Sequence, residues 1–218
     1  MFEEVTSQIG AVNRQLSTGS RAGKETKVVT VNQTYDADLA DVWDACTSPE
    51  RIPRWFLPVS GDLRLGGRYQ LEGNAAGEIL ECEPPRRFAV TWEYGGDVSW
   101  VEVRLAEAPE GRTTLELEHA AHVDAERWDE FGPGAVGVGW DLGLLGLNHH
   151  LSSGASVDPQ QAIAWQSSPE AREFMTRSSE DWCRASIEGG TDEAAAKAAA
   201  ARTTAAYTGA EPATKPAT

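Results

Sequence analysis

The sequence contains little cysteine and no long apolar run. Its three thiols, Cys46, Cys82 and Cys183, are odd in number and widely spaced, with no paired motif. This pattern argues against a disulfide framework and predicts buried or idle thiols. The most apolar stretch, residues 142–147, is far too short to cross a membrane. A membrane-spanning protein is therefore not expected.

The N-terminal segment also lacks the features of a secretory signal, and positive charge is scarce throughout. Residues 1–4 have no basic n-region, and no apolar h-region follows them. Lys and Arg number 19 against 34 Asp and Glu, which gives a formal net charge of −15. So acidic a surface repels phosphate backbones and anionic lipid. These absences predict a cytoplasmic protein that binds neither nucleic acid nor membrane.

Recognisable catalytic, nucleotide and metal motifs are missing as well. The segment 132–137 lacks the lysine and hydroxyl of a nucleotide loop, and no serine lies in a G-x-S-x-G frame. Histidines pair up as His119 with His122 and as His149 with His150, but adjacent histidines point to different helix faces. No cysteine or carboxylate completes a ligand set at suitable spacing. The sequence therefore predicts no metal and no cofactor.

An amphipathic segment opens the chain, and we predict a helix over residues 2–16. Its apolar residues follow a 3-4-3-4 spacing that places them on one helix face: Phe2, Val5, Ile9, Val12 and Leu16. A helix this short is marginal alone, so the stripe must bury against something. Two partners remain open, the chain's own domain or a second copy in a homodimer.

The middle of the chain predicts an antiparallel sheet. Residues 27–35 alternate and are rich in β-formers, which indicates a first strand. Asp36 or Asp38 then caps a helix, and Pro49 opens a second short helix that ends near Trp55 and Phe56. Turn residues separate further strands at 60–65, 68–73, 77–83, 87–94, 98–106 and 112–120. Connections this short force antiparallel pairing of about seven strands.

A long apolar helix is predicted to cover this sheet. Alternation gives the sheet one strongly apolar face, and residues 135–151 are apolar at nearly every helical offset. Gly137, Gly139, Gly143 and Gly146 each cost about 1 kcal/mol relative to alanine in a helix interior. So many glycines predict that backbone or a ligand approaches this helix closely.

Further helices follow, and the chain divides into four parts. A helix opens at Ser168, an alanine-rich helix runs from 191 to about Tyr207, and the last ten residues have the composition of a disordered tail. The predicted parts are an N-terminal helix and linker (1–26), the main domain (27–152), a C-terminal helical extension (153–208) and the tail (209–218).

Several segments, in order, resemble the START-like (SRPBCC) superfamily, in the branch named after heat-shock-chaperone ATPase activators. They are TYDADLADVWDACTSPERIPRWF (34–56), GGRYQLEG (66–73), GEILECEPPRRFAVTWEY (77–94) and TTLELEHAAH (113–122). The resemblance implies an α+β helix-grip fold, a curved antiparallel sheet around its long helix with a cavity between them. It leaves the function open, since its members include lipid carriers, hormone receptors, polyketide cyclases and chaperone cofactors.

Aromatic and polar residues on the apolar sheet face and the long helix are the candidate cavity residues. The predicted ligand-binding set is Tyr69, Trp92, Tyr94, Trp100, His119, Trp140, Asp141, Leu144, Leu145 and Asn148. The alternative is that these aromatics simply fill the core. His119 and Asp141 are the candidates for proton transfer, although an inward histidine is more often a satisfied core residue. Asp141 is either a site residue or on the exposed face.

Three functions remain open at this point. The first is binding of a small apolar or aromatic molecule, and the second is a polyketide cyclase or hydratase that uses the same cavity. The third is a protein–protein adaptor or chaperone cofactor. Residues beyond the long helix are expected to pack on the domain or to close over the cavity as a lid.

Overall fold

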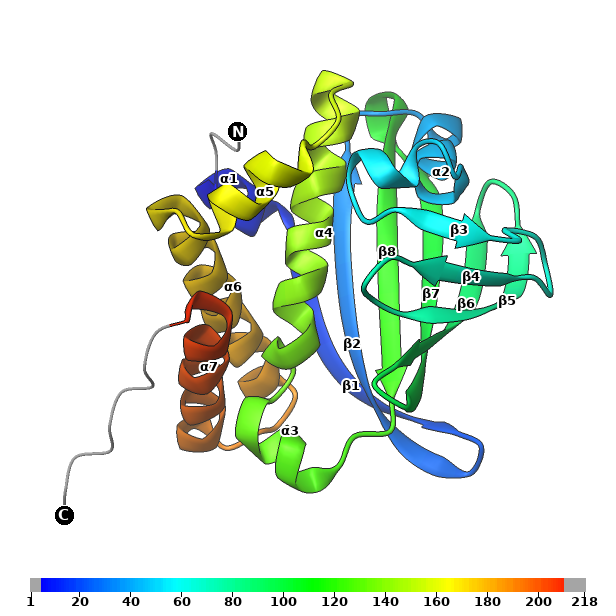
Figure 1. The fold of residues 1–218 in the computed structure, drawn as a ribbon. Coiled ribbons are helices and arrows are strands. Elements are labelled where there is room, and N and C mark those ends of the chain that lie inside the picture. The colour runs from blue at the N-terminus through cyan, green and yellow to red at the C-terminus, as the bar shows by residue number, and fades with distance from the viewer. Residues whose placement is uncertain (1–4, 210–218) are drawn as a thin grey trace, which may run out of the picture.

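The fold is α+β, with one antiparallel sheet curved around a long helix (Figure 1). The structure is a computed structural model and describes residues 5–209. Within that range the sheet has eight strands in the order β1-β2-β8-β7-β6-β5-β4-β3. The strands are β1 (Asn13–Arg21), β2 (Lys24–Tyr35), β3 (Val59–Gly61), β4 (Arg68–Leu71), β5 (Ala76–Glu83), β6 (Arg87–Tyr94), β7 (Asp97–Ala108) and β8 (Arg112–Ala121).

The long helix α4 (Gly134–Ser153) lies between most of the sheet and the C-terminal helices, of which α6 also contacts β1 (Figure 1). The other helices are α1 (Val5–Ala11), α2 (Leu39–Thr47), α3 (Ala125–Phe131), α5 (Pro159–Gln166), α6 (Pro169–Glu188) and α7 (Glu193–Thr208). Two 3-10 turns, η1 (Ile52–Arg54) and η2 (Pro109–Gly111), complete the order. The predicted helix-grip class, with extra helices at both ends, is confirmed. No helix among the described residues is both long and apolar enough to traverse a lipid bilayer.

The N-terminal helix predicted over residues 2–16 is wrong in its extent. Helix α1 ends at Ala11, and Asn13–Arg21 forms β1, which pairs with β2 along its whole length. Pairing with a neighbouring strand satisfies the hydrogen-bonding groups of this segment's backbone. The spacing of apolar residues carries no information about such pairing, so it could not predict the strand.

The apolar stripe of that segment packs within the chain. Ile9 and Val12 are buried in the core, and Leu16 is half-buried against it from β1. Phe2 and the side chain of Val5 lie outside the described residues. A homodimer through the whole predicted stripe would need Ile9 and Val12, which the chain itself already covers.

The glycines of α4 admit close neighbours, as their number predicts. A Cβ on Gly146 would lie 2.3 Å from the carbonyl oxygen of Trp55, and one on Gly137 would lie 2.2 Å from the indole of Trp182. Gly143 differs, because its Cβ would stand at an ordinary 3.6 Å from Phe56. Backbone therefore presses against one side of α4 and an aromatic ring against another.

The helix starts follow the sequence closely. Asp38 caps α2 by accepting a hydrogen bond from the Asp41 amide, and Ser168 and Asp192 cap α6 and α7 in the same way. The second short helix predicted after Pro49 is the 3-10 turn η1, which carries the chain across the open end of the sheet. Helix α2 and η1 thereby reach the end of α4 and close one side of the core.

Candidate functional site

A cavity of about 170 Å³ lies between the sheet, α4 and the segment formed by α2 and η1. Its lining is almost wholly apolar or aromatic. The residues are Cys46, Thr47, Ile52, Trp55, Phe56, Val59, Leu63, Tyr69, Leu71, Ile79, Cys82, Phe88, Val90, Trp92, Val101, Val103, Leu115, Leu117, Trp140, Gly143, Leu144 and Leu147.

Local periodicity explains how these side chains meet. Alternate residues of β6, β7 and β8 point to the concave face of the sheet, where they form one wall. Helix α4 contributes Trp140, Gly143, Leu144 and Leu147, the i, i+3, i+4 and i+7 positions of one helix face. Gly143 in that face leaves room beside the ring of Phe56.

The segment of α2 and η1 forms the opposite wall and is tied down by hydrogen bonds. Trp55 donates its indole N–H to the Ala45 carbonyl at 2.9 Å. Phe56 lies nearly parallel to Trp140, with ring centroids 6.4 Å apart and an angle of 15°. Aromatic surface therefore faces the cavity from both sides.

The cavity wall carries no formal charge near neutral pH. No Lys, Arg, Asp, Glu or His is among the described residues that line it. Burial raises the pKa of the Cys46 thiol to about 12, and burial likewise raises the pKa of Tyr69. The Tyr69 hydroxyl donates to the Thr91 carbonyl at 2.8 Å. The arrangement suits an uncharged molecule and offers no ionised group to it.

The predicted site residues separate into those that line the cavity and those that do not. Tyr69, Trp92, Trp140 and Leu144 are in the lining. Leu145 is buried and Asn148 half-buried, and neither is in the lining.

Two of the predicted aromatic residues lie away from the cavity. Tyr94 is 61% exposed at the end of β6, beyond the reach of the sheet's cover. Trp100 alternates with the inward Val101, so its ring lies on the opposite face of β7. There the guanidinium of Arg21 stacks over that ring at 4.9 Å.

His119 lies directly behind the cavity wall, and both of its ring nitrogens are engaged. The indole of Trp140 donates to Nδ1 at 3.1 Å, and Nε2 lies 2.8 Å from the hydroxyl of Ser99. Ser99 in turn donates to the Trp92 carbonyl at 3.1 Å. One tautomer satisfies the chain, a neutral ring with its proton on Nε2. Burial lowers the pKa of His119 to about 4, which favours that neutral form.

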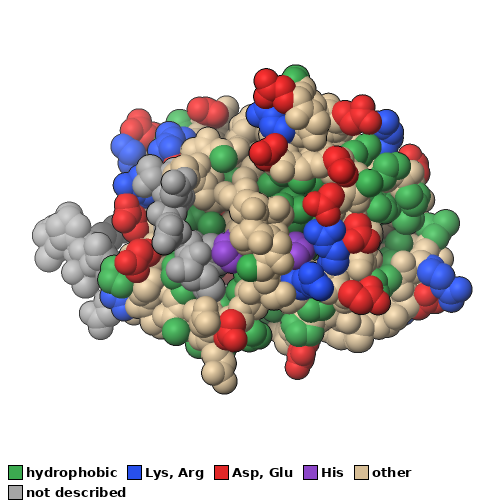
Figure 2. All heavy atoms as spheres, turned by 90° about the horizontal axis from the view of Figure 1, so that it is seen from above, with side chains coloured by type: hydrophobic (Ala, Val, Ile, Leu, Met, Phe, Trp, Pro, Cys, Tyr) green, Lys and Arg blue, Asp and Glu red, His purple; other side chains and the backbone are tan. Residues whose placement is uncertain are grey.

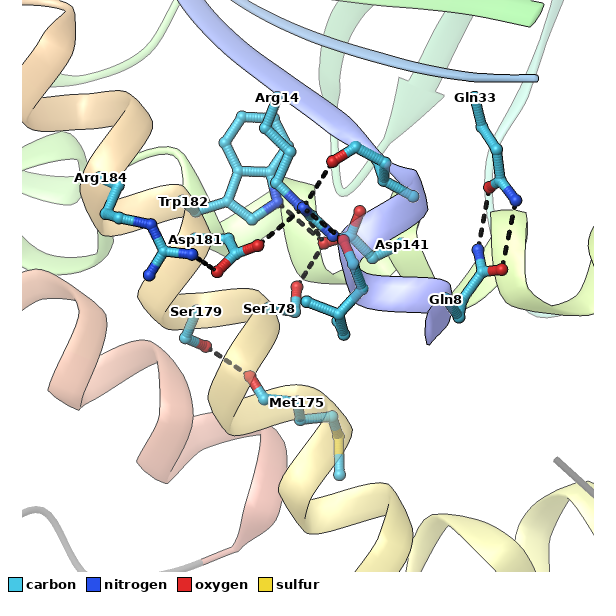
Figure 3. Close-up of polar contacts among 12 residues, drawn as sticks. Gln8, Arg14, Gln33, Asp141, Met175, Ser178, Ser179, Asp181, Trp182 and Arg184 are labelled. Carbon is cyan, nitrogen blue, oxygen red and sulfur yellow. Dashed lines mark hydrogen bonds and ion pairs between the residues drawn. The ribbon is translucent and has the colours of Figure 1, made fainter. Parts of the chain in front are cut away.

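Asp141 faces away from the cavity, into a polar junction with the N-terminal segment and α6 (Figure 3). Its Oδ2 accepts hydrogen bonds from Arg14 Nε at 2.9 Å, from Trp182 Nε1 at 3.2 Å and from Ser178. Arg14 also pairs with Asp181 at 3.0 Å. Burial raises the pKa of Asp141, and Arg14 opposes the rise. The carboxylate is neither exposed nor in the cavity.

His150, at the end of α4, lies beside an ion-pair cluster. His150 lies with Nδ1 at 2.8 Å from the Ala155 carbonyl and Nε2 within reach of Arg51, which pairs with Asp41 and Asp44. Seen from above this end, histidine side chains lie beside basic and acidic ones (Figure 2). No three His, Cys, Asp or Glu side chains among residues 5–209 are grouped to hold a metal ion.

Sequence reasoning missed the walls contributed by α2, η1 and the short strands. The unpredicted lining residues from these elements and their flanks include Cys46, Ile52, Trp55, Phe56, Val59, Ile79 and Cys82. The apolar residues around Pro53 could have indicated this wall, because a short apolar helix between the capped helix and the next strand is expected to pack against the apolar face of the sheet.

Comparison with known proteins gives the family. Residues 36–152 match the family described as activator of Hsp90 ATPase homolog 1-like protein. The crystal structure of CalU16 from Micromonospora echinospora is 38% identical, with a TM-score of 0.65 over 80% of this chain and 98% of that one. Its solution structure is 37% identical, with a TM-score of 0.69 over 83% and 97%.

A more distant structure shares the fold alone. EF2215 from Enterococcus faecalis is 14% identical, with a TM-score of 0.59 over 86% of this chain and 96% of that one. No protein with a curated description matches the sequence significantly. With its family match across more than half of the sequence and its likeness to CalU16, this chain belongs to the activator of Hsp90 ATPase homolog 1-like family, within the START-like superfamily.

Proposed function

We propose that the chain binds a small, uncharged, apolar or aromatic molecule in the cavity between the sheet and α4. The observation that carries this proposal is the uncharged aromatic lining on both walls. Ligand sites are mostly apolar, with a few placed polar groups that fix orientation. The polar groups in this lining are the hydroxyls of Thr47 and Tyr69, the two thiols and the indole N–H groups of its tryptophans.

The volume sets the size of the molecule. An engineered cavity of roughly 150 Å³ lined by aliphatic and aromatic side chains stays dry and binds benzene. At about 170 Å³ this cavity is of the same order. A single substituted aromatic ring is therefore the ligand size that the cavity accepts without rearrangement.

Filling the cavity tests the proposal. Leu144→Phe extends a lining side chain into the space, whereas Leu145→Phe makes the same change at the next residue of α4, outside the lining. Toluene binding, followed by chemical-shift titration, should weaken at least tenfold in the first variant. It should change less than threefold in the second. Equal affinity in both variants, or no binding by the unchanged protein, contradicts the proposal.

The two alternative functions have less support. A cyclase or hydratase would need a proton-transfer group facing the ligand, and neither His119 nor Asp141 is among the lining residues. An adaptor or chaperone cofactor would use an outer surface and leave the cavity without a role. No residue of α5, α6 or α7 is among the described residues that line the cavity.

A further inference from the structure

His119, on β8, holds Trp140 of the cavity wall by a hydrogen bond, although His119 itself does not line the cavity. It is 7% exposed and does not line the cavity, yet it accepts the indole N–H of Trp140, which does. Trp140 is the only lining residue of α4 with a hydrogen-bonding side chain. An indole whose N–H is held by a fixed acceptor presents one ring face and one edge to the cavity.

Aromatic rings and apolar side chains surround the imidazole of His119. Its ring lies edge-to-face with Trp140 at 5.7 Å and tilted against Trp92 at 6.2 Å. On β8 its neighbours across the sheet are Val29 of β2 and Val101 of β7. Burial alone accounts for the lowered pKa of His119, with no contribution from a charged side chain on β2, β6, β7 or α4. With Nε2 committed to Ser99, only the Nδ1 lone pair remains for Trp140.

We propose that His119 is a positioning residue, which sets the orientation of the Trp140 indole and thereby the shape that the cavity selects. This inference rests on the proposed binding function and adds a specificity-determining residue to it. Trp140 in turn packs against Trp92 at 5.1 Å and stacks on Phe56, so turning its ring would alter both aromatic walls. A change at His119 should therefore alter which aromatic molecules bind, without removing any atom from the lining.

Three variants separate the two hydrogen bonds of the imidazole. His119→Phe keeps a ring but offers Trp140 no acceptor. His119→Asn carries an amide oxygen near the position of Nδ1 and so restores an acceptor. Ser99→Ala removes the partner of Nε2 and leaves the Trp140 bond in place.

The experiment follows the Trp140 indole N–H by ¹H–¹⁵N NMR, assigned with Trp140→Phe, alongside toluene titration. His119→Phe should shift that signal upfield, speed its exchange with solvent at least tenfold and weaken toluene binding about tenfold. His119→Asn and Ser99→Ala should stay within threefold of the unchanged protein in both readouts.

Two results would overturn the positioning role. One is an unchanged indole signal in His119→Phe. The other is a loss of affinity that follows the melting temperature equally in all three variants. Failure of the unchanged protein to bind toluene is a different result, since it removes the proposed function and the positioning role falls with it.

Discussion

The two sides of α4 have different surroundings, one facing the sheet and the other facing α6. Toward the sheet, Trp140, Gly143 and Leu144 border an uncharged cavity. Toward α6, Gly137 and Asp141 contact Trp182 closely, and Asp141 forms a buried ion pair with Arg14. Neighbouring residues Trp140 and Asp141 thus have opposite surroundings. The comparison teaches that close packing on this helix is local: Gly137 and Asp141 are tightly packed around a polar junction, whereas Trp140, Gly143 and Leu144 border an apolar cavity.

The sharpest way to break the comparison is to remove the carboxylate from the packed side. Asp141→Ala leaves the buried Arg14 with Asp181 as its remaining carboxylate and should lower the free energy of unfolding by about 3 kcal/mol, the low end of the range for a broken buried pair. Urea denaturation measures the change. The double variant Arg14→Met with Asp141→Leu should recover most of the loss, because no buried charge is stranded. A cost below about 1 kcal/mol for the single variant would contradict a tightly coupled pair.

The pH dependence of stability tests the cavity side of α4, where His119 is buried behind the cavity wall. Because its pKa is lowered to about 4 in the folded chain, the unfolded chain takes up the proton first as the pH falls below the ordinary value of 6.5. Stability from this residue is complete above pH 6.5 and is lost toward pH 4, by roughly 3 kcal/mol. Urea titrations at pH 7 and pH 4 should show this excess loss in the unchanged protein relative to His119→Asn. Identical pH dependence in both would contradict it.

Two glycine substitutions on α4 compare the sides directly, and the packed side should give the larger effect. Gly137→Ala places a methyl group 2.2 Å from the fully buried Trp182 ring. The ring has to move, and overpacking of this kind costs about 1–3 kcal/mol. Thermal denaturation should show a clearly lower melting temperature. An unchanged melting temperature would mean that the junction is loosely packed.

On the cavity side the same substitution should have the opposite sign. Gly143→Ala meets Phe56 at an ordinary 3.6 Å, and its backbone is helical. Replacing a helical glycine without a clash stabilises by about 0.4–1 kcal/mol. The same denaturation experiment measures it beside Gly137→Ala. Destabilisation of both variants to the same degree would erase the distinction between the two sides.

Local pattern was enough to predict most of the sheet and the helix that it grips. Alternation in β6, β7 and β8 gave their positions within a few residues, and also the face that borders the cavity. The same rule already excludes Trp100, because it alternates with Val101. Where the prediction named Trp100, aromatic character had outweighed the position of the residue in the strand.

What escaped prediction depends on partners far away in the sequence. Arg14 and Asp141 are 127 residues apart, so nothing near either residue announces the pair. Strand β1 is polar and is stabilised by its pairing with β2. The helical spacing that holds for Ile9 and Val12 was therefore extended too far along the sequence. Long-range pairing, rather than weak local signal alone, accounts for both errors.

The position of β2 has a consequence for where the family's shared sequence and the folding unit begin. The family match starts at residue 36, immediately after β2 ends at Tyr35. Yet β2 is the neighbour of β8 in the sheet, and the hairpin that it forms with β1 carries Arg14 to Asp141. A chain trimmed to residues 36–152 would turn β8 into an unprotected edge open to aggregation, and would remove Arg14 and the residues of α6 that contact Asp141. The segment that the family model matches is therefore shorter than the segment that completes the sheet.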